Sequence, residues 1–141
     1  MSILSVKNLS KSFGKLEVLN DISFNVEKGE VISIIGPSGS GKSTLLRCIN
    51  QFEKIDSGEC EICGITMTRN DENGKAVYAD NKTLHDIRLK IGLVFQNYAL
   101  FPSMNVAKNV GYGLKMHKVP QPEIDERVNE ALELVKLGGY N

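Results

Sequence analysis

The sequence predicts an α/β protein with a single core. Three patterns occur in order along the chain: alternating apolar and polar residues, an apolar run that leads into a glycine-rich loop, and helical spacing of apolar residues after that loop. Alternation indicates strands with one face in water, a continuous apolar run indicates a strand buried on both faces, and the later spacing indicates helices. A chain of 141 residues is long enough for one core but not for two.

The composition is that of an ordinary soluble protein, with 41% hydrophobic and 24% charged residues. Lys+Arg and Asp+Glu both number 17, and such a balance offers no basic stripe, so we expect no nucleic-acid partner. The apolar run at 31–35 is far shorter than the roughly 20 residues of a membrane helix. Because the first residues also lack the pattern of an export signal, we expect a soluble chain that is not exported.

Three cysteines, Cys48, Cys60 and Cys63, are an odd number in a chain without an export signal. This favours reduced thiols over a disulfide framework. Cys60 and Cys63 form one C-x-x-C, but no second pair follows, and in an extended strand these two positions point to opposite faces. We interpret them as incidental small apolar residues and not as a metal or redox site.

The first half of the chain predicts strands and one helix. Residues 3–26 alternate and are broken at glycines, which indicates short antiparallel strands with glycine turns. The run VISIIG at 31–36 predicts a strand buried on both faces. After the glycine loop, residues 42–51 carry apolar residues at helical spacing, and residues 56–67 return to strand-like alternation.

The second half predicts helices around one more strand. The polar segment 68–82, with Asn-Gly at its centre, predicts an exposed loop or hairpin tip. Residues 83–90 read as a short helix, and IGLVF at 91–95 as a second buried strand. Residues 105–117 and 122–137 then predict two helices, the second with proline at its start and a glycine pair at its end.

The loop GPSGSGKS, residues 36–43, matches the pattern G-x-x-x-x-G-K-[ST]. Small residues let the backbone curl so that its N–H groups point at phosphate oxygens, the Lys42 ammonium reaches the β and γ phosphates, and the Ser43 hydroxyl ligates Mg²⁺. The helix that follows adds its positive N-terminal end. A chance match occurs in well under about one chain in a hundred of this length. The predicted phosphate-binding residues are Ser38, Gly39, Ser40, Gly41, Lys42, Ser43 and Thr44.

The sequence resembles the ATP-binding subunits of ABC transporters over nearly its whole length. The similar segments are LSVKNLSKSFGKLEVLNDISFNVEKGEVISIIGPSGSGKSTLLRCIN, DSGECEICG and IGLVFQNYALFPSMNVAKNV. LLRCIN after the loop, a long polar insertion before VFQ, and LFP-x-M-x-V look most like the polar amino-acid importers of bacteria. The resemblance implies an incomplete ABC ATPase domain of the P-loop NTPase fold, a RecA-like core with an antiparallel β subdomain. It implies a nucleotide-binding core with Walker A and Q-loop glutamine over 1–96 and the start of a helical subdomain over 97–141.

The resemblance also implies roles for single residues, with ATP and Mg²⁺ as the bound groups. Phe13 matches an aromatic residue that stacks on adenine, and Val18 a residue that packs beside the base; from the residues alone, Phe13 is equally an ordinary half-buried strand residue. Gln96 matches the Q-loop glutamine, which reaches the metal and the attacking water. Lys42 and Gln96 are therefore the implied catalytic residues, and Ser43 and Gln96 the implied metal ligands.

Several partners follow from the same resemblance. The apolar loop from Tyr98 to Met104 corresponds to the start of the surface that receives a helix of the membrane subunit, and an apolar patch there would mark a partner. Two intact subunits would pair head to tail, at the cytoplasmic face of the membrane, and the amino acid would bind to other subunits. His85 and His117 match no family position, and we assign them no role.

The chain departs from the family pattern after residue 137. It holds no LSGGQ signature, no apolar strand that ends in Asp-Glu, and no switch histidine. Because phosphoryl transfer needs a positioned nucleophile and neutralised charge, we expect this chain to bind ATP·Mg²⁺ without appreciable hydrolysis, whereas the intact importer subunit would couple binding and hydrolysis to transport.

Three alternative functions stay open. A GTPase or small-molecule kinase shares the loop, but NKTL at 81–84 has Leu where the guanine-binding N-K-x-D has Asp. An ABC ATPase without a membrane partner is opposed by the neutral charge and by the LFP-x-M-x-V segment. A non-catalytic binding module, the third, is close to what we expect of this chain alone.

Overall fold

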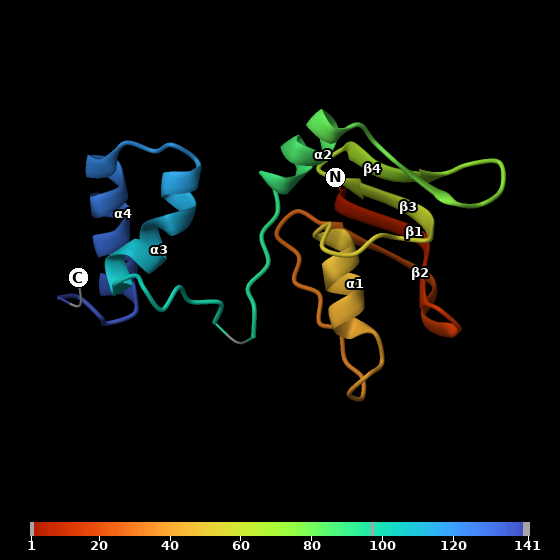
Figure 1. Ribbon diagram of the computed structural model, residues 1–141, viewed down its shortest axis with the longest axis horizontal. Coiled ribbons are helices and arrows are strands. Elements are labelled where there is room, and N and C mark those ends of the chain that lie inside the picture. The colour runs from red at the N-terminus through yellow and green to blue at the C-terminus, as the bar shows by residue number, and fades with distance from the viewer. Residues whose placement is uncertain (1, 97, 140–141) are drawn as a thin grey trace. The chain divides into compact units, whose positions relative to one another are not determined.

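An antiparallel sheet organises the first part of the chain (Figure 1). Two strands of twelve residues each, longer than the short strands expected, form a hairpin whose two-residue loop begins at Gly14 with a φ of 61°. Three shorter strands extend the sheet in the order β2-β1-β3-β4-β5. The strands are β1 (Ser2–Phe13), β2 (Leu16–Glu27), β3 (Ser57–Ile62), β4 (Ile65–Asn70) and β5 (Ala76–Tyr78).

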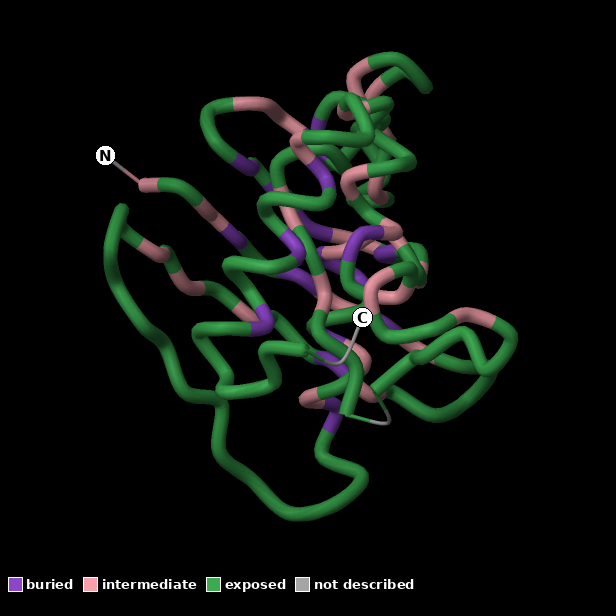
Figure 2. The backbone as a smooth tube through the Cα atoms, turned by 90° about the vertical axis from the view of Figure 1, so that its left-hand side faces the viewer, coloured by how far each residue is buried: buried purple, intermediate pink, exposed green. Residues whose placement is uncertain are grey.

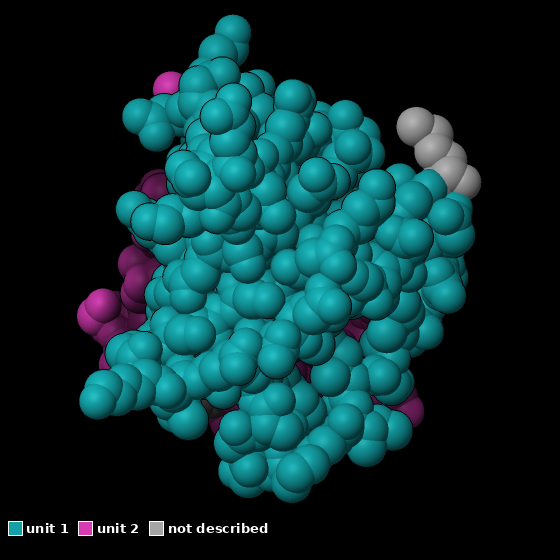
Figure 3. All heavy atoms as spheres, turned by 90° about the vertical axis from the view of Figure 1, so that its right-hand side faces the viewer, with its two compact units in different colours: residues 1–93 teal, residues 94–141 magenta. Residues whose placement is uncertain are grey.

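The structure is a computed structural model that describes residues 2–96 and 98–139. The chain divides into two compact units, residues 1–93 and residues 94–141, which Figure 3 colours separately. No helix of the described residues is long and apolar enough to cross a membrane. The helices are α1 (Lys42–Ile49) and α2 (Asn81–Arg88) in the first unit, and α3 (Val106–Met116) and α4 (Gln121–Leu134) in the second.

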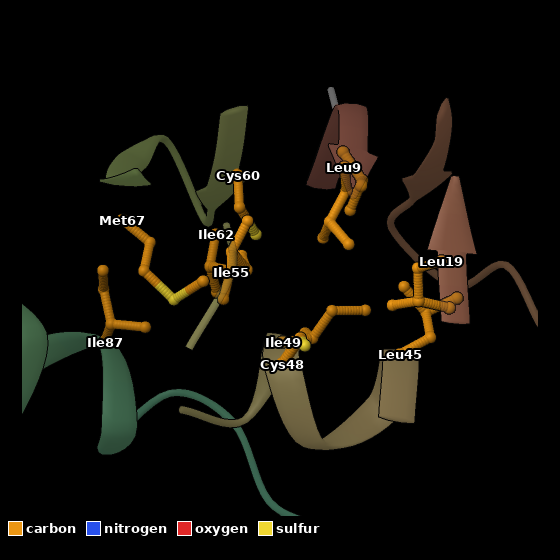
Figure 4. Close-up of a cluster of buried hydrophobic side chains, with 11 residues drawn as sticks. Leu9, Leu19, Leu45, Cys48, Ile49, Ile55, Cys60, Ile62, Met67 and Ile87 are labelled. Carbon is orange, nitrogen blue, oxygen red and sulfur yellow. The ribbon is translucent and has the colours of Figure 1, made fainter. Parts of the chain in front are cut away.

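Side chains from the sheet and from α1 form the core of the first unit (Figure 4). α1 buries Leu45, Cys48 and Ile49, which lie on one face of the helix, and β3 contributes every second residue, as in Cys60 and Ile62. Each fully buried Leu, Ile, Val or Met side chain contributes roughly 1.5–3 kcal/mol when it leaves water. The buried cluster is Val6, Leu9, Leu19, Leu45, Cys48, Ile49, Ile55, Cys60, Ile62, Met67 and Ile87.

Two aspartates organise the polar segment between β4 and α2. The backbone N–H of Asp71 donates to Lys75 O at 2.8 Å, and Asp71 Oδ1 accepts from the N–H groups of Asn73 and Lys75. Asp80 caps α2 by accepting from the Thr83 N–H at 2.8 Å, and the hydrogen bonds from Thr83 lower the pKa of Asp80. The short helix is confirmed, although it begins at Asn81 and ends at Arg88. The exposed hairpin tip is confirmed only for residues 71–75, because residues 68–70 and 76–78 belong to β4 and β5 and Thr68 is fully buried.

The second unit is a pair of helices. α3 and α4 bury Ile124, Val128 and Leu132, and Ala107, Leu114 and Val119 pack against this cluster. α3 is capped by the Asn105 side chain, which accepts from the Lys108 N–H at 2.9 Å. Both helices confirm the apolar periodicity of the sequence, although α4 ends at Leu134 and not at residue 137.

Two strands expected from the sequence are not formed in the described residues. Residues 31–36 and 91–95 pair with no strand of the sheet. Val31 is 90% exposed, Ile35 93% and Val94 96%, and Figure 2 colours the backbone by this burial. The prediction of two buried strands is therefore wrong for this structure. A buried strand needs hydrogen-bonding neighbours at its edges and cover on both faces, and an apolar sequence alone supplies neither.

Gly58, on β3, lies close to the backbone of β1. Its φ is 115°, and a Cβ atom added there would lie 2.6 Å from Leu9 Cα and 2.8 Å from Asn8 O. Gly64 also has a positive φ, 76°, but an added Cβ would meet nothing within 4 Å. The two glycines therefore differ in steric cost while sharing backbone strain.

We expect Gly58→Ala to lower the free energy of unfolding by about 3 kcal/mol or more, because a clash with backbone adds to the strain. Gly64→Ala should cost only about 1 kcal/mol, the strain alone. Urea unfolding followed by circular dichroism measures both, and equal losses would contradict the β1–β3 geometry.

Candidate phosphate-binding site

The glycine loop is fixed where it enters α1. Gly41 precedes the helix in the left-handed region with φ 86°, and its carbonyl oxygen accepts the Leu45 N–H at 2.9 Å. A Cβ atom at this position would lie 2.8 Å from Val18 O and 2.9 Å from Leu19 Cδ2. Only glycine fits both the conformation and the space, so the end of the loop lies directly against β2.

The first turn of α1 offers backbone donors. Within the described part of the chain, the N–H groups of residues 41–44 and of Gly39 have no hydrogen-bond acceptor. These are the groups that a helix leaves unpaired at its N-terminus, where the helix dipole also concentrates positive charge. The loop therefore presents a set of N–H donors whose hydrogen bonds an anion can accept.

Lys42 adds a full positive charge to these donors. Its Nζ donates to Gly36 O at 2.8 Å, Pro37 O at 2.6 Å and Ser40 Oγ at 3.2 Å. No carboxylate of the described residues forms an ion pair with Lys42. The ammonium is thus held within the span of the loop by neutral oxygens, and its charge is available to an anion.

An apolar cavity lies next to the loop. It has a volume of about 500 Å³ and is lined by β2, residues 32–37 and the start of α1, with Ile22, Phe24 and Leu45 among its walls. Apolar walls cannot compensate the charge of a phosphate. The hydrogen-bond donors that an anion needs therefore lie in the loop and not on the apolar walls of this cavity.

The predicted base-binding residues lie on the same hairpin. Phe13, the last residue of β1, is 46% exposed. Val18 is half-buried, and its Cγ1 would lie 3.2 Å from a Cβ on Gly41, so the structure brings Val18 against the loop. In Figure 1 the glycine loop before α1 and the β1–β2 turn lie at the same, lower end of the first unit.

The predicted metal ligands fall in different units. Ser43 is exposed in the first turn of α1, and a hydroxyl there fits Mg²⁺, which takes most of its ligands from phosphates and water. Gln96 is exposed and belongs to the second unit, so its role stays a prediction. No cluster of three or more His, Cys, Asp or Glu side chains suited to a metal occurs among the described residues. Ser38, Gly39 and Ser40 are exposed in the loop, and Thr44 is half-buried on α1.

The comparison with protein families decides the identity of the chain. A family model described as ABC transporter matches residues 19–141. The chain belongs to the ABC transporter family. The match begins in β2 and includes the whole glycine loop and all four helices.

Solved ABC proteins share the fold. The structure of cbiO1 from Clostridium perfringens, part of the ABC transporter complex cbiONQ, is 32% identical with a TM-score of 0.72 over 94% of this chain. The ATP-binding cassette MJ0796, in a dimeric post-hydrolysis state bound to ADP and Pi, is 33% identical with a TM-score of 0.75 over 96% of this chain. The predicted fold class, an ABC ATPase domain, is confirmed.

A curated relative is longer than this chain. The sn-glycerol-3-phosphate import ATP-binding protein of Ruegeria sp. (strain TM1040) is 42% identical over 140 residues, which are 99% of this chain and 36% of that protein. The chain likewise covers 49% of the cbiO1 chain and 58% of the MJ0796 chain. It therefore spans about a third to three fifths of the length of the ABC proteins that it matches.

Sequence reasoning missed one residue next to Phe13, the predicted base-binding residue. Lys11 is 7% exposed on β1, with Nζ 3.0 Å from Asp56 Oδ1 and 5.0 Å from the centroid of the Phe13 ring. The sequence pattern did give one indication. Leu9 and Lys11 are two residues apart and so share a face of the strand, and a charged side chain on a buried face needs a partner. Its partner, 45 residues later, could not be identified from local spacing.

The cysteines provide a test of the excluded metal or redox site. Burial raises the pKa of Cys48 to about 11 and the pKa of Cys60 to about 12, whereas Cys63 is exposed. Only the thiolate reacts, so at pH 8 a thiol reagent should modify one cysteine of the folded chain rapidly and all three in denaturant.

Cys63→Ser is the matched variant for this experiment, and it should remove the rapid reaction. Rapid reaction of two thiols in the folded wild-type chain would contradict the buried position of Cys60.

Proposed function

We propose that this chain binds ATP with Mg²⁺ as the nucleotide-binding part of an ABC transporter ATPase. The observation that carries the proposal is the convergence of unpaired N–H groups at residues 41–44 with the Lys42 ammonium. Phosphate oxygens are anionic acceptors and match this donor set. Phe13, half exposed, offers a ring face to adenine, and Val18 lies between that ring and the loop in sequence and against the loop in space.

The remaining assignments belong to the intact protein. We propose Ser43 and Gln96 as ligands of Mg²⁺, which when bound neutralises charge on the phosphates, and Gln96 as the residue that orients water. Residues 1–96 would form the nucleotide-binding core and residues 97–141 the start of a helical subdomain. The intact subunit would hydrolyse ATP as a head-to-tail pair, and the chain of 141 residues would bind without appreciable turnover, because it holds no LSGGQ and no apolar strand that ends in Asp-Glu.

Lys42→Ala should weaken ATP binding at least about tenfold, because a hydrogen bond to a charged group is lost at an exposed site. Isothermal titration calorimetry measures the change. Lys82→Ala, which removes an exposed lysine from α2, is the matched control and should leave the affinity unchanged.

Three results would contradict the proposal. Equal ATP affinity in wild type and Lys42→Ala would show that Lys42 of the glycine loop does not contribute to ATP binding. Displacement of ATP by much lower concentrations of GTP would favour a GTPase. Steady-state phosphate release that Lys42→Ala abolishes would show that the chain hydrolyses ATP on its own.

The exposed apolar loop from Tyr98 to Met104 is a second surface, and it is suited to contact with a membrane subunit. In the loop from Tyr98 to Met104, Tyr98 is 84% and Leu100 67% exposed. Asn109 holds this loop, since its Oδ1 accepts the Phe101 N–H at 2.8 Å and its Nδ2 donates to Phe101 O and Met104 O. We propose that these exposed apolar side chains contact the membrane subunit, at the cytoplasmic face of the membrane.

Leu100→Asp in the intact protein should prevent recovery of the subunit with its membrane partner, because a buried carboxylate would lack a counter-charge. Leu134→Asp, on α4 and 85% exposed, is the control and should leave the complex intact. Co-purification from membranes measures both, and loss of the complex only with Leu134→Asp would move the partner surface to α4.

For the transported class we propose polar amino acids, on the basis of LLRCIN, the polar insertion at 68–82 and LFP-x-M-x-V. The relative from Ruegeria is named for sn-glycerol-3-phosphate import and does not support this finer assignment. Uptake of labelled polar amino acids and of sn-glycerol-3-phosphate by vesicles that hold the whole transporter separates the two. Uptake of the phosphate compound alone would overturn the amino-acid proposal.

A further inference from the structure

Lys11 is a buried cation with two acidic partners. Its Nζ lies 3.0 Å from Asp56 Oδ1 and 3.5 Å from Glu53 Oε1. Burial by itself disfavours a charged lysine, but the hydrogen bond and charge of Asp56, together with Glu53, outweigh it and raise the pKa of Lys11. The side chain therefore carries its charge at neutral pH.

The same ammonium lies over the ring of Phe13. Residues two apart in a strand share a face, and Lys11 Nζ is 5.0 Å from the ring centroid, within the roughly 6 Å at which a cation and an aromatic face attract each other. Phe13 is nevertheless 46% exposed. The ring thus has a cation at one face while a large part of its surface stays open to a ligand.

Asp56 ties the backbone next to the ring as well. Its Oδ2 accepts the Ser12 N–H at 2.7 Å, and its own N–H donates to Ser10 O at 3.1 Å. One carboxylate therefore fixes both the backbone before Phe13 and the cation over the ring. The position of Lys11 is set by the fold and does not depend on a bound nucleotide.

We propose that Lys11 is a positioning residue for the adenine base, acting through the ring of Phe13. The inference rests on the proposed function, in which Phe13 stacks on adenine. A cation over one face holds the ring in place and draws π-electron density toward itself, which favours stacking of an electron-rich purine on the open face. The contacts of Lys11 are with Asp56, Glu53 and the Phe13 ring and not with the glycine loop, so we expect its effect to depend on the presence of the base.

The test compares ATP with inorganic tripolyphosphate, which has the phosphates without the base. Lys11→Met keeps the apolar stem and removes the charge. We expect it to weaken ATP binding about two- to tenfold and to leave tripolyphosphate binding unchanged, as measured by calorimetry with Mg²⁺. Lys11→Arg should keep the wild-type ATP affinity, and Lys7→Met, which removes an exposed lysine from the same strand, should change neither ligand.

Two further variants separate positioning from stability. Lys11→Gln is neutral but keeps a donor for Asp56, so it should fold if Lys11→Met does not, and it should show the same loss for ATP alone. In a Phe13→Ala background, Lys11→Met should cause no further loss of ATP affinity, because the ring through which it acts is gone.

The outcomes distinguish this inference from the proposed function. A wild-type chain that binds neither ligand overturns the proposed function and the inference with it. A wild-type chain that binds both ligands, with Lys11 variants that lose no affinity or lose equal affinity for ATP and tripolyphosphate, overturns the inference alone.

Discussion

The packing of α1 on the antiparallel sheet determines where the other parts of the site lie. Leu45, Cys48 and Ile49 are buried against the sheet, and α1 begins at Lys42, immediately after the glycine loop. The direction of the first N–H groups is therefore fixed by the core and not by the loop, whose own backbone makes few hydrogen bonds. Gly41 completes the arrangement, because its lack of a side chain lets the loop end directly on β2.

Charge is distributed along α1 in keeping with this packing. At its N-terminal end, positive charge faces no carboxylate in the described residues, as an anion site requires. Beyond its C-terminal end, the carboxylates of Glu53 and Asp56 lie against the buried Lys11 ammonium, so this buried cation is not left without a counter-charge. Within the described part of the chain, one short helix thus connects a region with an unpaired positive charge to a region where a buried cation has two acidic partners.

Local patterns in the sequence predicted the glycine loop, the antiparallel strands and the helices, because spacing and turn residues act over a few positions. They failed for 31–36 and 91–95, since strand formation there depends on neighbours that an apolar run does not specify. They also missed Lys11, because its partner Asp56 lies 45 residues later in the sequence, beyond β2 and α1, and is brought close only by the fold. Residue types could be read from the sequence, but the partners of strands and side chains that lie far apart in the sequence could not be predicted.

The double role of Asp56 has a consequence for the energetics of ligand entry. Because it joins the end of β1 to the segment after α1, the backbone before Phe13 and the ammonium over the Phe13 ring are held by one carboxylate before any ligand arrives. Such preorganisation is completed during folding, so less conformational entropy remains to be lost when a ligand binds. The surroundings of the Phe13 ring are then already fixed in the empty chain.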